Sequence, residues 1–260
     1  MIELAYVGHA TTLIRVGGAT VLTDPVLRSR IGPLRRHGPP ADPAARDADV
    51  VVISHQHRDH LDLPSLARLR PDTPFVAPKA AGPLIERAGI ERVIGLSPGE
   101  SARVAGLAIT ATEAVHDGRR DPWGKAAEPM GVLLERGSER VYFPGDTDLF
   151  EGMAALGPLD LALLPVWGWG PNLGSGHLDP AEAARALKLL RPRVAVPIHW
   201  GTLYPAGLSV LRPRPLSEPP RRFAELAARE APDVDVRVLE PGERTTVDAM
   251  MRAMPRPGAV

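Results

Sequence analysis

The apolar residues of this 260-residue chain fall into short runs that predict β-strands. Near the start, IELAYV, TTLIRV and ATVLT follow one another closely, and the pair Gly17-Gly18 between the last two is typical of a tight hairpin. The continuous runs VVVI, LDLALLPV and VAVPI have the length of buried strands. The segment GVLLERGSERVYF predicts another hairpin around Gly137-Ser138.

Helical patterns alternate with these strands. Asp62 predicts the start of a helix that runs to about Arg70, and DPAEAARALKLLR carries a capping box from Asp179 to Glu182. KAAGPLIERAG and FAELAARE predict two further helices, and VDVRVLEPGE predicts the last strand. Residues 28–49, 118–130 and 204–220 are weakly patterned. We therefore expect one α/β domain over residues 1–248, with sheets covered by helices, and a tail over 249–260.

Composition removes several classes of function. Lys plus Arg and Asp plus Glu both number 31, so the chain has no net charge to attract nucleic acid. No apolar run reaches about 18 residues, which argues against stable membrane insertion, and the first residues do not have the pattern of a signal peptide. The absence of cysteine excludes disulfides and thiolate metal ligands. We expect a cytoplasmic protein.

Metal-ligating residue types follow the ends of the apolar runs. The stretch SHQHRDH, residues 54–60, places three histidines and one aspartate directly behind VVVI. His116 follows LAITATEAV, Asp146 follows VYFPG and His199 follows VAVPI. Strand ends gather along one edge of a sheet, where ligand crevices of α/β proteins lie. We therefore expect these donors to meet, although a packing role for His116 or His199 and a turn role for Asp146 remain alternatives.

Seven donors exceed one tetrahedral shell, so we expect two ions. In an extended segment His55 and His57 point to the same side. The first ion would take His55, His57 and His116, the second would take Asp59, His60 and His199, and Asp146 would bridge them. Imidazole with carboxylate suits zinc first, with manganese or iron as alternatives.

The same residues resemble a known signature. SHQHRDH resembles the HxHxDH motif of the metallo-β-lactamase-fold hydrolase superfamily, and His116, Asp146 in GDT and His199 in PIHWGT match its later metal positions. Within that superfamily, GHATTLI, TDPVL, GPLRRHGPP and HLDPAEA are similar to the branch that contains N-acyl-phosphatidylethanolamine phospholipase D and L-ascorbate 6-phosphate lactonase. The resemblance implies a four-layer αβ/βα sandwich, with a dinuclear site at one edge between the two sheets.

Three further residues are candidates near this site. Asp24 in LTDP is placed to accept a hydrogen bond from a metal-bound histidine, or to act as a turn residue before Pro25. His9 in the GHAT turn either faces the site or is a structural histidine. His177 in SGHLDP matches a position that faces substrate in the resembling branch.

Four residues are candidates for binding the substrate. Arg35 and Arg36 lie in an Arg-rich loop that could bind phosphate, although such clusters are also common on plain surface. Trp167 and Trp169 alternate with glycines after a buried strand and could form a pocket wall or pack over the edge of the sandwich.

Metal-assisted hydrolysis is the leading interpretation. A hydroxide that bridges two ions would attack a phosphodiester, or an ester or lactone, of a small soluble substrate that carries a phosphate. Asp59 would hold the second ion and orient the nucleophile, and His177 would assist the leaving oxygen. Asp117 follows His116 where the phospholipases usually have tryptophan, which argues against a membrane lipid. The alternatives are a redox di-iron protein on the same fold, or a non-catalytic nucleic-acid or regulatory binding protein.

Overall fold

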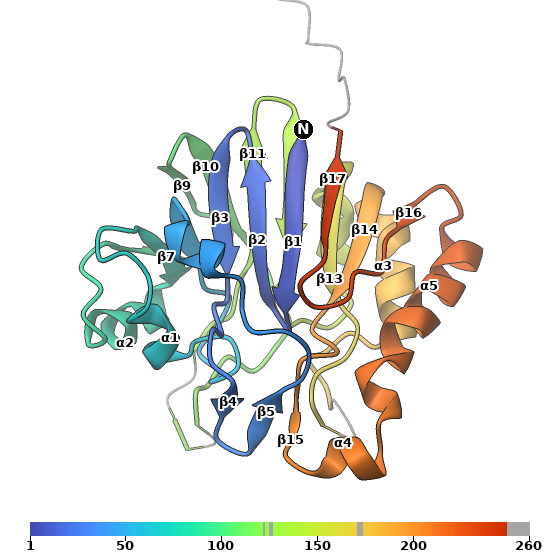
Figure 1. Ribbon diagram of the computed structural model, residues 1–260. Helices are drawn as coiled ribbons and strands as arrows, with labels where there is room; N and C mark the ends of the chain where they lie inside the picture. The colour runs from blue at the N-terminus through green and yellow to red at the C-terminus, as the bar shows by residue number, and fades with distance from the viewer. Residues whose placement is uncertain (122, 125–126, 171–173, 249–260) are drawn as a thin grey trace, which may run out of the picture.

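Two seven-stranded mixed sheets form the centre of the molecule (Figure 1). The computed structural model describes residues 1–121, 123–124, 127–170 and 174–248. The strand order of the first sheet is β17 (Arg244–Val247), β1 (Ile2–Gly8), β2 (Thr11–Val16), β3 (Ala19–Thr23), β6 (Val50–Val52), β7 (Phe75–Pro78) and β8 (Val93–Leu96). The order of the second is β16 (Asp235–Val236), β14 (Pro192–Ile198), β13 (Leu159–Pro165), β12 (Glu139–Phe143), β11 (Gly131–Arg136), β10 (Leu107–Thr112) and β9 (Ser101–Val104).

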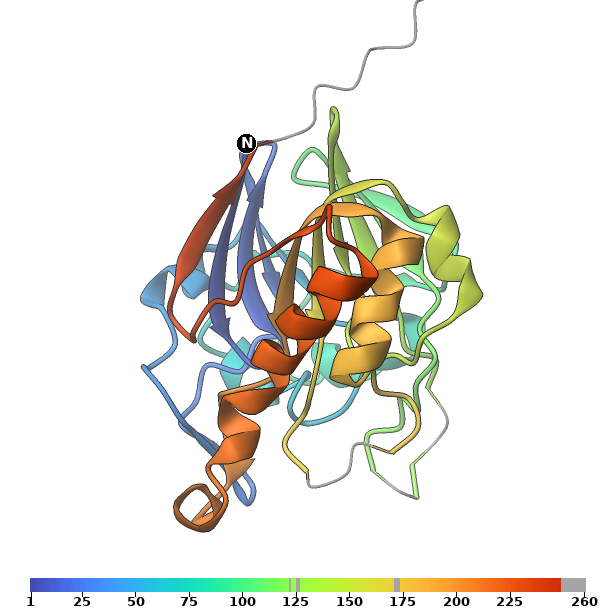
Figure 2. The same cartoon turned by 90° about the vertical axis from the view of Figure 1, so that its right-hand side faces the viewer.

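Helices cover the outer sides of both sheets, which confirms the expected four-layer αβ/βα sandwich. The first sheet carries α1 (Leu63–Leu66), α2 (Gly82–Glu86) and the 3₁₀ turns η1 (Pro43–Asp47) and η2 (Lys79–Ala81). The second sheet carries α3 (Pro180–Leu190), α5 (Glu218–Glu230) and η3 (Glu151–Ala155). Figure 2 shows α3 and α5 side by side along the second sheet.

The alternation of side chains along each strand builds two separate cores. Val50 and Val52 point between the sheets, where they join one large apolar cluster with residues of the second sheet. Val51 and Phe75 point the other way and pack in a cluster with residues of α1 and α2, including Leu66. A strand that is buried on both faces has no polar side, which explains why VVVI is a continuous apolar run.

Two hairpins and one helix cap match the sequence predictions. Val16 pairs with Ala19 across Gly17-Gly18, and Arg136 pairs with Glu139 in the second hairpin. In α3 the Asp179 carboxylate accepts from the backbone N–H of Glu182, whose side chain accepts from the N–H of Asp179.

Two sequence predictions about elements were wrong. The helix after Asp62 ends at Leu66 instead of Arg70, because the bonds that follow are the shorter contacts of turns, from the N–H of Arg68 to the carbonyl of Ser65 and from the N–H of Leu69 to that of Leu66. The Asp62 carboxylate pairs with Arg28 and accepts from the Ser65 hydroxyl instead of capping the helix. The last strand does not span VDVRVLEPGE. Only Asp235–Val236 pairs there, and the chain then crosses to the first sheet, where Arg244–Val247 lies antiparallel to β1.

Two of the weakly patterned segments, residues 28–49 and 204–220, contribute to a small third sheet that matters for the site. Its order is β15 (Leu203–Pro205), β5 (Leu34–Arg36) and β4 (Arg30–Ile31), and it lies below the large sheets in Figure 1. The short α4 (Leu208–Leu211) and η4 (Arg214–Leu216) follow it. The predicted tail, 249–260, lies outside the described residues. Among the described residues, no helix is long and apolar enough to cross a membrane.

Candidate metal centre

The predicted donors meet at one edge of the two large sheets. His55, His57, Asp59 and His60 lie in the loop after β6 of the first sheet. The remaining three follow strands of the second sheet, namely His116 after β10, Asp146 after β12 and His199 after β14. Each strand delivers its donors just beyond its last residue, so segments far apart in the chain contribute to one site.

The first group of donors is His55, His57 and His116. Nδ1 of His57 lies 2.9 Å from Nε2 of His55 and 3.1 Å from Nε2 of His116. One nitrogen from each ring falls in a set whose members all lie within 4.8 Å of one another. Three imidazole nitrogens at this spacing match the ligands of a single tetrahedral ion, with metal–nitrogen distances of about 2.0–2.1 Å.

The second group is centred on His60 and His199, whose Nε2 atoms lie 3.0 Å apart. Oδ2 of Asp59 lies 3.9 Å from each of these two nitrogens. His9 also belongs to this set of closely spaced donors.

Asp146 lies between the two groups. Its Oδ2 is 3.1 Å from Nε2 of His60 and 3.9 Å from Nε2 of His55, and its Oδ1 is 3.3 Å from Nε2 of His199. Oδ1 is buried and has no hydrogen-bond partner among the described residues. A buried carboxylate oxygen without a donor is costly in a protein interior. A cation at this point would satisfy it, so the residues fit a metal site.

The protonation of the histidines also fits metal binding. Burial lowers the pKa of His116 to about 4 and that of His199 to about 3, and it holds the pKa of His55 well below its ordinary value. These rings are therefore neutral at pH 7, which is the form that binds a metal.

Asp146 and His60 form the charged part of the cluster. Burial opposes ionisation of Asp146, but His199 and His60 hold its pKa well below the ordinary value. Burial also opposes charge on His60, yet Asp146 and Asp24 raise its pKa well above the ordinary value. The metal-free cluster thus keeps a proton on His60 where a bound cation would supply the positive charge.

A layer of hydrogen bonds orients the donor rings. Nδ1 of His60 lies 2.7 Å from Oδ2 of Asp24, and that carboxylate also accepts from the N–H and the hydroxyl of Ser54. Asp24 is therefore placed in the orienting role that the sequence suggested for it.

Two other rings are oriented by backbone carbonyls. Nδ1 of His116 donates to the carbonyl of Gly176 at 2.8 Å, and Nδ1 of His199 donates to the carbonyl of Trp167. Each bond leaves Nε2 free to face the cluster, which is the usual arrangement around a metal. Sequence reasoning missed both partners, because a carbonyl acceptor has no side-chain signature. The half-buried ring of Trp167 packs against the main core.

A cavity of about 490 Å³ opens onto the cluster. One wall is apolar and comes from the third sheet, with Ile31 and Leu34. His177 lines the cavity, with Nε2 3.6 Å from Oδ2 of Asp146. Trp169 is 41% exposed, lines the same cavity and donates its indole N–H to Oδ2 of Asp59.

Arg35 and Arg36 do not line this cavity, and their role in phosphate binding stays a prediction from the sequence. The Arg36 guanidinium donates to the carbonyls of Val7 and Val26 and thereby ties the third sheet to the first. Arg35 is exposed on β5. The arginines that line the cavity are instead Arg58, inside the SHQHRDH stretch, and Arg120.

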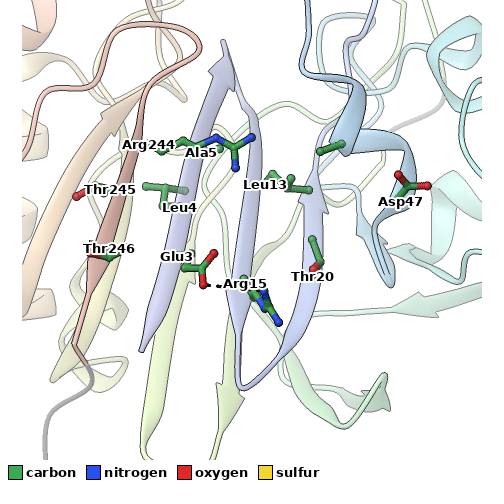
Figure 3. Close-up of a pocket in the computed structure, with 11 residues that line it drawn as sticks. Glu3, Leu4, Ala5, Leu13, Arg15, Thr20, Asp47, Arg244, Thr245 and Thr246 are labelled. Carbon is green, nitrogen blue, oxygen red and sulfur yellow. Dashed lines mark ion pairs between the residues drawn. The ribbon is translucent and has the colours of Figure 1, made fainter.

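A second hollow lies on the outer face of the first sheet (Figure 3). Its volume of about 660 Å³ exceeds that of the cavity at the histidines. Its lining includes Glu3 and Arg15, which lie 4.0 Å apart, and contains no histidine. We assign the functional site to the smaller cavity because the clustered donors open into that one.

Residues 19–200 match the model of the β-lactamase superfamily domain, and this range includes all seven predicted donors. The chain belongs to the metallo-β-lactamase-fold family of metal-dependent hydrolases. A UPF0173 metal-dependent hydrolase of Deinococcus radiodurans is 32% identical over 94% of this chain and 99% of the relative.

Two further members of the metallo-β-lactamase-fold family extend the comparison. N-acyl-phosphatidylethanolamine-hydrolyzing phospholipase D 1 of Caenorhabditis elegans is 34% identical over 80% of this chain and 67% of its own length. The structure of Igni18, a metallo hydrolase of Ignicoccus hospitalis, aligns with a TM-score of 0.70 at 29% identity and covers 94% of this chain and 97% of that one. His9 lies ahead of the range that the family model matches.

Proposed function

We propose that this protein binds two divalent cations at the cluster and hydrolyses a phosphodiester, or an ester or lactone, of a small molecule. The observation that carries the proposal is the position of Asp146. Its Oδ2 faces His60 of the second group and His55 of the first, and its Oδ1, which faces His199, has no hydrogen-bond partner among the described residues. Zinc is the proposed metal, because the donors are imidazole nitrogens and carboxylate oxygens.

In this proposal His55, His57 and His116 hold one cation and Asp59, His60 and His199 hold the other, with Asp146 shared. Bound divalent ions would lower the pKa of a water molecule between them and polarise the scissile bond. The chain contributes neutral histidine rings, a floor of buried side chains beneath the cavity and the hydrogen bonds that fix the orientation of the rings. Asp59 also faces the cavity, where it can orient the attacking water.

We propose that His177 donates the proton that the leaving oxygen takes up. In hydrolysis, water adds to phosphorus or to the carbonyl carbon, the bond to the leaving oxygen breaks, and that oxygen takes up a proton. The His177 ring lies on the cavity wall, 4.7 Å from the ring of His116 between centroids. His177 does not directly follow a strand, and its backbone N–H donates to the Asp148 carboxylate at 3.0 Å. A side chain at the wall can reach a substrate oxygen that the floor residues cannot.

The cavity lining supports a substrate with an anionic group and an apolar portion. Arg58 and Arg120 supply cationic groups, and Ile31, Leu34 and Trp169 supply apolar surface. Guanidinium pairs well with phosphate or carboxylate. The similarity to a phospholipase D supports the phosphodiester ahead of the lactone.

A substrate panel tests this proposal. Protein reconstituted with zinc, manganese or iron should cleave a small phosphodiester such as bis(4-nitrophenyl) phosphate faster than a neutral nitrophenyl ester or a lactone of similar size. The Asp146→Asn variant is the control for contaminating hydrolases. Faster turnover of the neutral substrates would move the assignment to an esterase or lactonase. Three preparations are compared, each loaded with two equivalents of zinc, of manganese or of iron. If none of them hydrolyses any substrate of the panel, the proposed hydrolysis is wrong.

A further inference from the structure

His9 occupies a backbone position that favours glycine. It follows Gly8 in the tight turn between β1 and β2, and its φ is +58°. Histidine adopts positive φ much less readily than glycine does. The side chain is nonetheless present and fully buried. Residues held in such conformations cluster at functional sites, so we expect the imidazole of His9 to contribute to the site.

The imidazole makes one directed hydrogen bond, to the donor cluster. Its Nε2 lies 3.0 Å from Oδ2 of Asp59. An ionised carboxylate only accepts hydrogen bonds, so Nε2 carries the hydrogen. Nδ1 is buried and has no hydrogen-bond partner among the described residues, which leaves it as the bare lone pair of that tautomer. The ring also packs on His199, with 3.9 Å between the centroids.

The backbone of His9 is tied to the same region by bonds that do not involve the ring. Its carbonyl accepts from the N–H of His199 at 2.8 Å, and its N–H donates to the hydroxyl of Thr202 at 3.0 Å. These bonds join the GHAT turn of the first sheet to the loop after β14 of the second. Replacing the side chain leaves both bonds possible, so a variant can isolate the contribution of the imidazole.

We propose that His9 is a positioning residue of the second donor group, which holds the Asp59 carboxylate toward His60 and His199. The inference rests on the proposed function in one respect, the assignment of Asp59 as a metal donor. The N–H of His9 reaches Asp59 from the buried side, whereas the indole N–H of Trp169 reaches the same oxygen from the cavity. Without His9, the buried side of this carboxylate loses its fixed contact, and the carboxylate can rotate away from the two rings.

Three variants of His9 test the role of its N–H. His9→Gln keeps a donor at the reach of Nε2, His9→Leu fills similar space without a donor, and His9→Gly has no donor but accepts the positive φ without strain. His37→Leu is the matched control, because His37 lies outside the cluster, with its ring 6.4 Å from that of Tyr204. Zinc retention against a competing chelator and the visible spectrum of the cobalt(II)-loaded protein are the measurements, with thermal unfolding as the check on folding.

His9→Leu should keep one tightly held equivalent and bind the second about 10–100-fold more weakly, as expected for loss of an outer hydrogen-bond partner. Its cobalt spectrum should change, His9→Gln should recover most of the affinity, and His37→Leu should match the unchanged protein. If His9→Leu does not fold, His9→Gly gives the same reading. Two equivalents held with unchanged affinity and an unchanged spectrum in the donor-free variants would overturn the inference. Equal losses in His9→Gln and His9→Leu would also overturn it, because they would make the ring a ligand or a packing group.

The two proposals fail in different ways. If the unchanged protein binds two ions and hydrolyses nothing, the proposed function is wrong. The metal affinities of the His9 variants still show whether His9 positions Asp59. If the unchanged protein is active and the donor-free variants keep normal metal affinity, only the role of His9 falls.

Discussion

Nδ1 of His60 lies 2.7 Å from Oδ2 of Asp24, and both side chains are completely buried. The pair joins the loop after β3 to the loop after β6 and turns Nε2 of His60 toward Asp146 and His199. Asp24 holds this position with φ of +34°, in the region that favours glycine. The orientation of the central donor of the cluster therefore depends on a carboxylate that is not itself one of the seven donors.

Replacing Asp24 by asparagine should weaken metal binding. The carboxylate accepts from two groups of Ser54 and from His60, and an amide presents its NH₂ to at least one of those donors. We expect the affinity of the ion bound by His60 to fall about 10–100-fold. Competition with a chelator measures it, with Asp72→Asn as the control, because the Asp72 side chain is 79% exposed. Equal affinity in both variants would show that Asp24 does not support the metal.

Asp146→Asn tests the shared position. An amide carries no charge and offers one acceptor oxygen in place of two, so both equivalents of metal should be lost or strongly weakened. Elemental analysis of protein purified without chelator should give about two equivalents for the unchanged chain, as expected for a two-metal site. Circular dichroism should show that the variant remains folded. Near-normal turnover in Asp146→Asn would contradict the shared assignment, as would full activity of a one-metal preparation.

His177→Ala separates the wall of the cavity from its floor. Metal content should stay at the level of the unchanged protein, and turnover should fall by roughly 10²–10⁴-fold if the ring supplies a proton. A substrate with a very acidic leaving group needs less proton donation, so the loss should be smaller with nitrophenol than with an alcohol. Loss of metal in this variant would make His177 a ligand. Unchanged turnover for both leaving groups would exclude the role.

Arg58→Ala tests whether the Arg58 guanidinium binds the anionic group of the substrate. Arg58 lines the cavity, whereas Arg35 is exposed on β5 and outside it. The KM of a phosphorylated substrate should rise in Arg58→Ala, while the KM of a neutral ester and the kcat of both should change little. Arg35→Ala is the matched control and should have normal kinetics with both substrates. The same KM change for the neutral ester would show that Arg58 does not select charge.

The metal-free protein should lose stability as the pH falls from about 7 to about 4. The unfolded chain protonates each histidine near pH 6.5, but the folded chain protonates His116 only near 4 and His199 near 3. Below 6.5 the unfolded state therefore binds more protons, which favours unfolding. His60 has the opposite sign, because its raised pKa adds stability below 6.5 that is lost as pH rises through the folded value. Burial also lowers the pKa of His55 and His57, so the histidines that destabilise the fold at low pH outnumber His60.

Urea unfolding of chelator-treated protein across this pH range measures the effect. His116→Gln removes one titrating ring, so its free energy of unfolding should decline less steeply between pH 6.5 and 4 than that of the unchanged chain. A decline of equal slope in the variant would mean that His116 does not contribute.

Local patterns predicted sheets covered by helices and the meeting of the donors at a sheet edge, whereas the four-layer arrangement was implied by the resemblance to a known family. Gly17-Gly18 favours a tight hairpin because both residues accept positive φ, and an apolar run followed by histidines places them at a strand end. The final strand could not be found this way, because the pairing of Arg244–Val247 with β1 depends on a partner more than 200 residues away. The charge of Arg36 suggested a ligand, but the guanidinium bonds to carbonyls that only the assembled third sheet brings near.

The division of the donors between the two sheets has a consequence for how the molecule holds together. His60 and His199 are 139 positions apart in the chain, and each proposed ion takes donors from both halves of the sandwich. A bound cation would therefore act as a cross-link that closes a very long loop, in a chain that has no cysteine to do so. Each ion would raise stability in proportion to the logarithm of its free concentration above its dissociation constant. Metal supply would then influence the stability of the folded protein as well as its activity, and the metal-free protein should unfold at a lower temperature than the metal-loaded one.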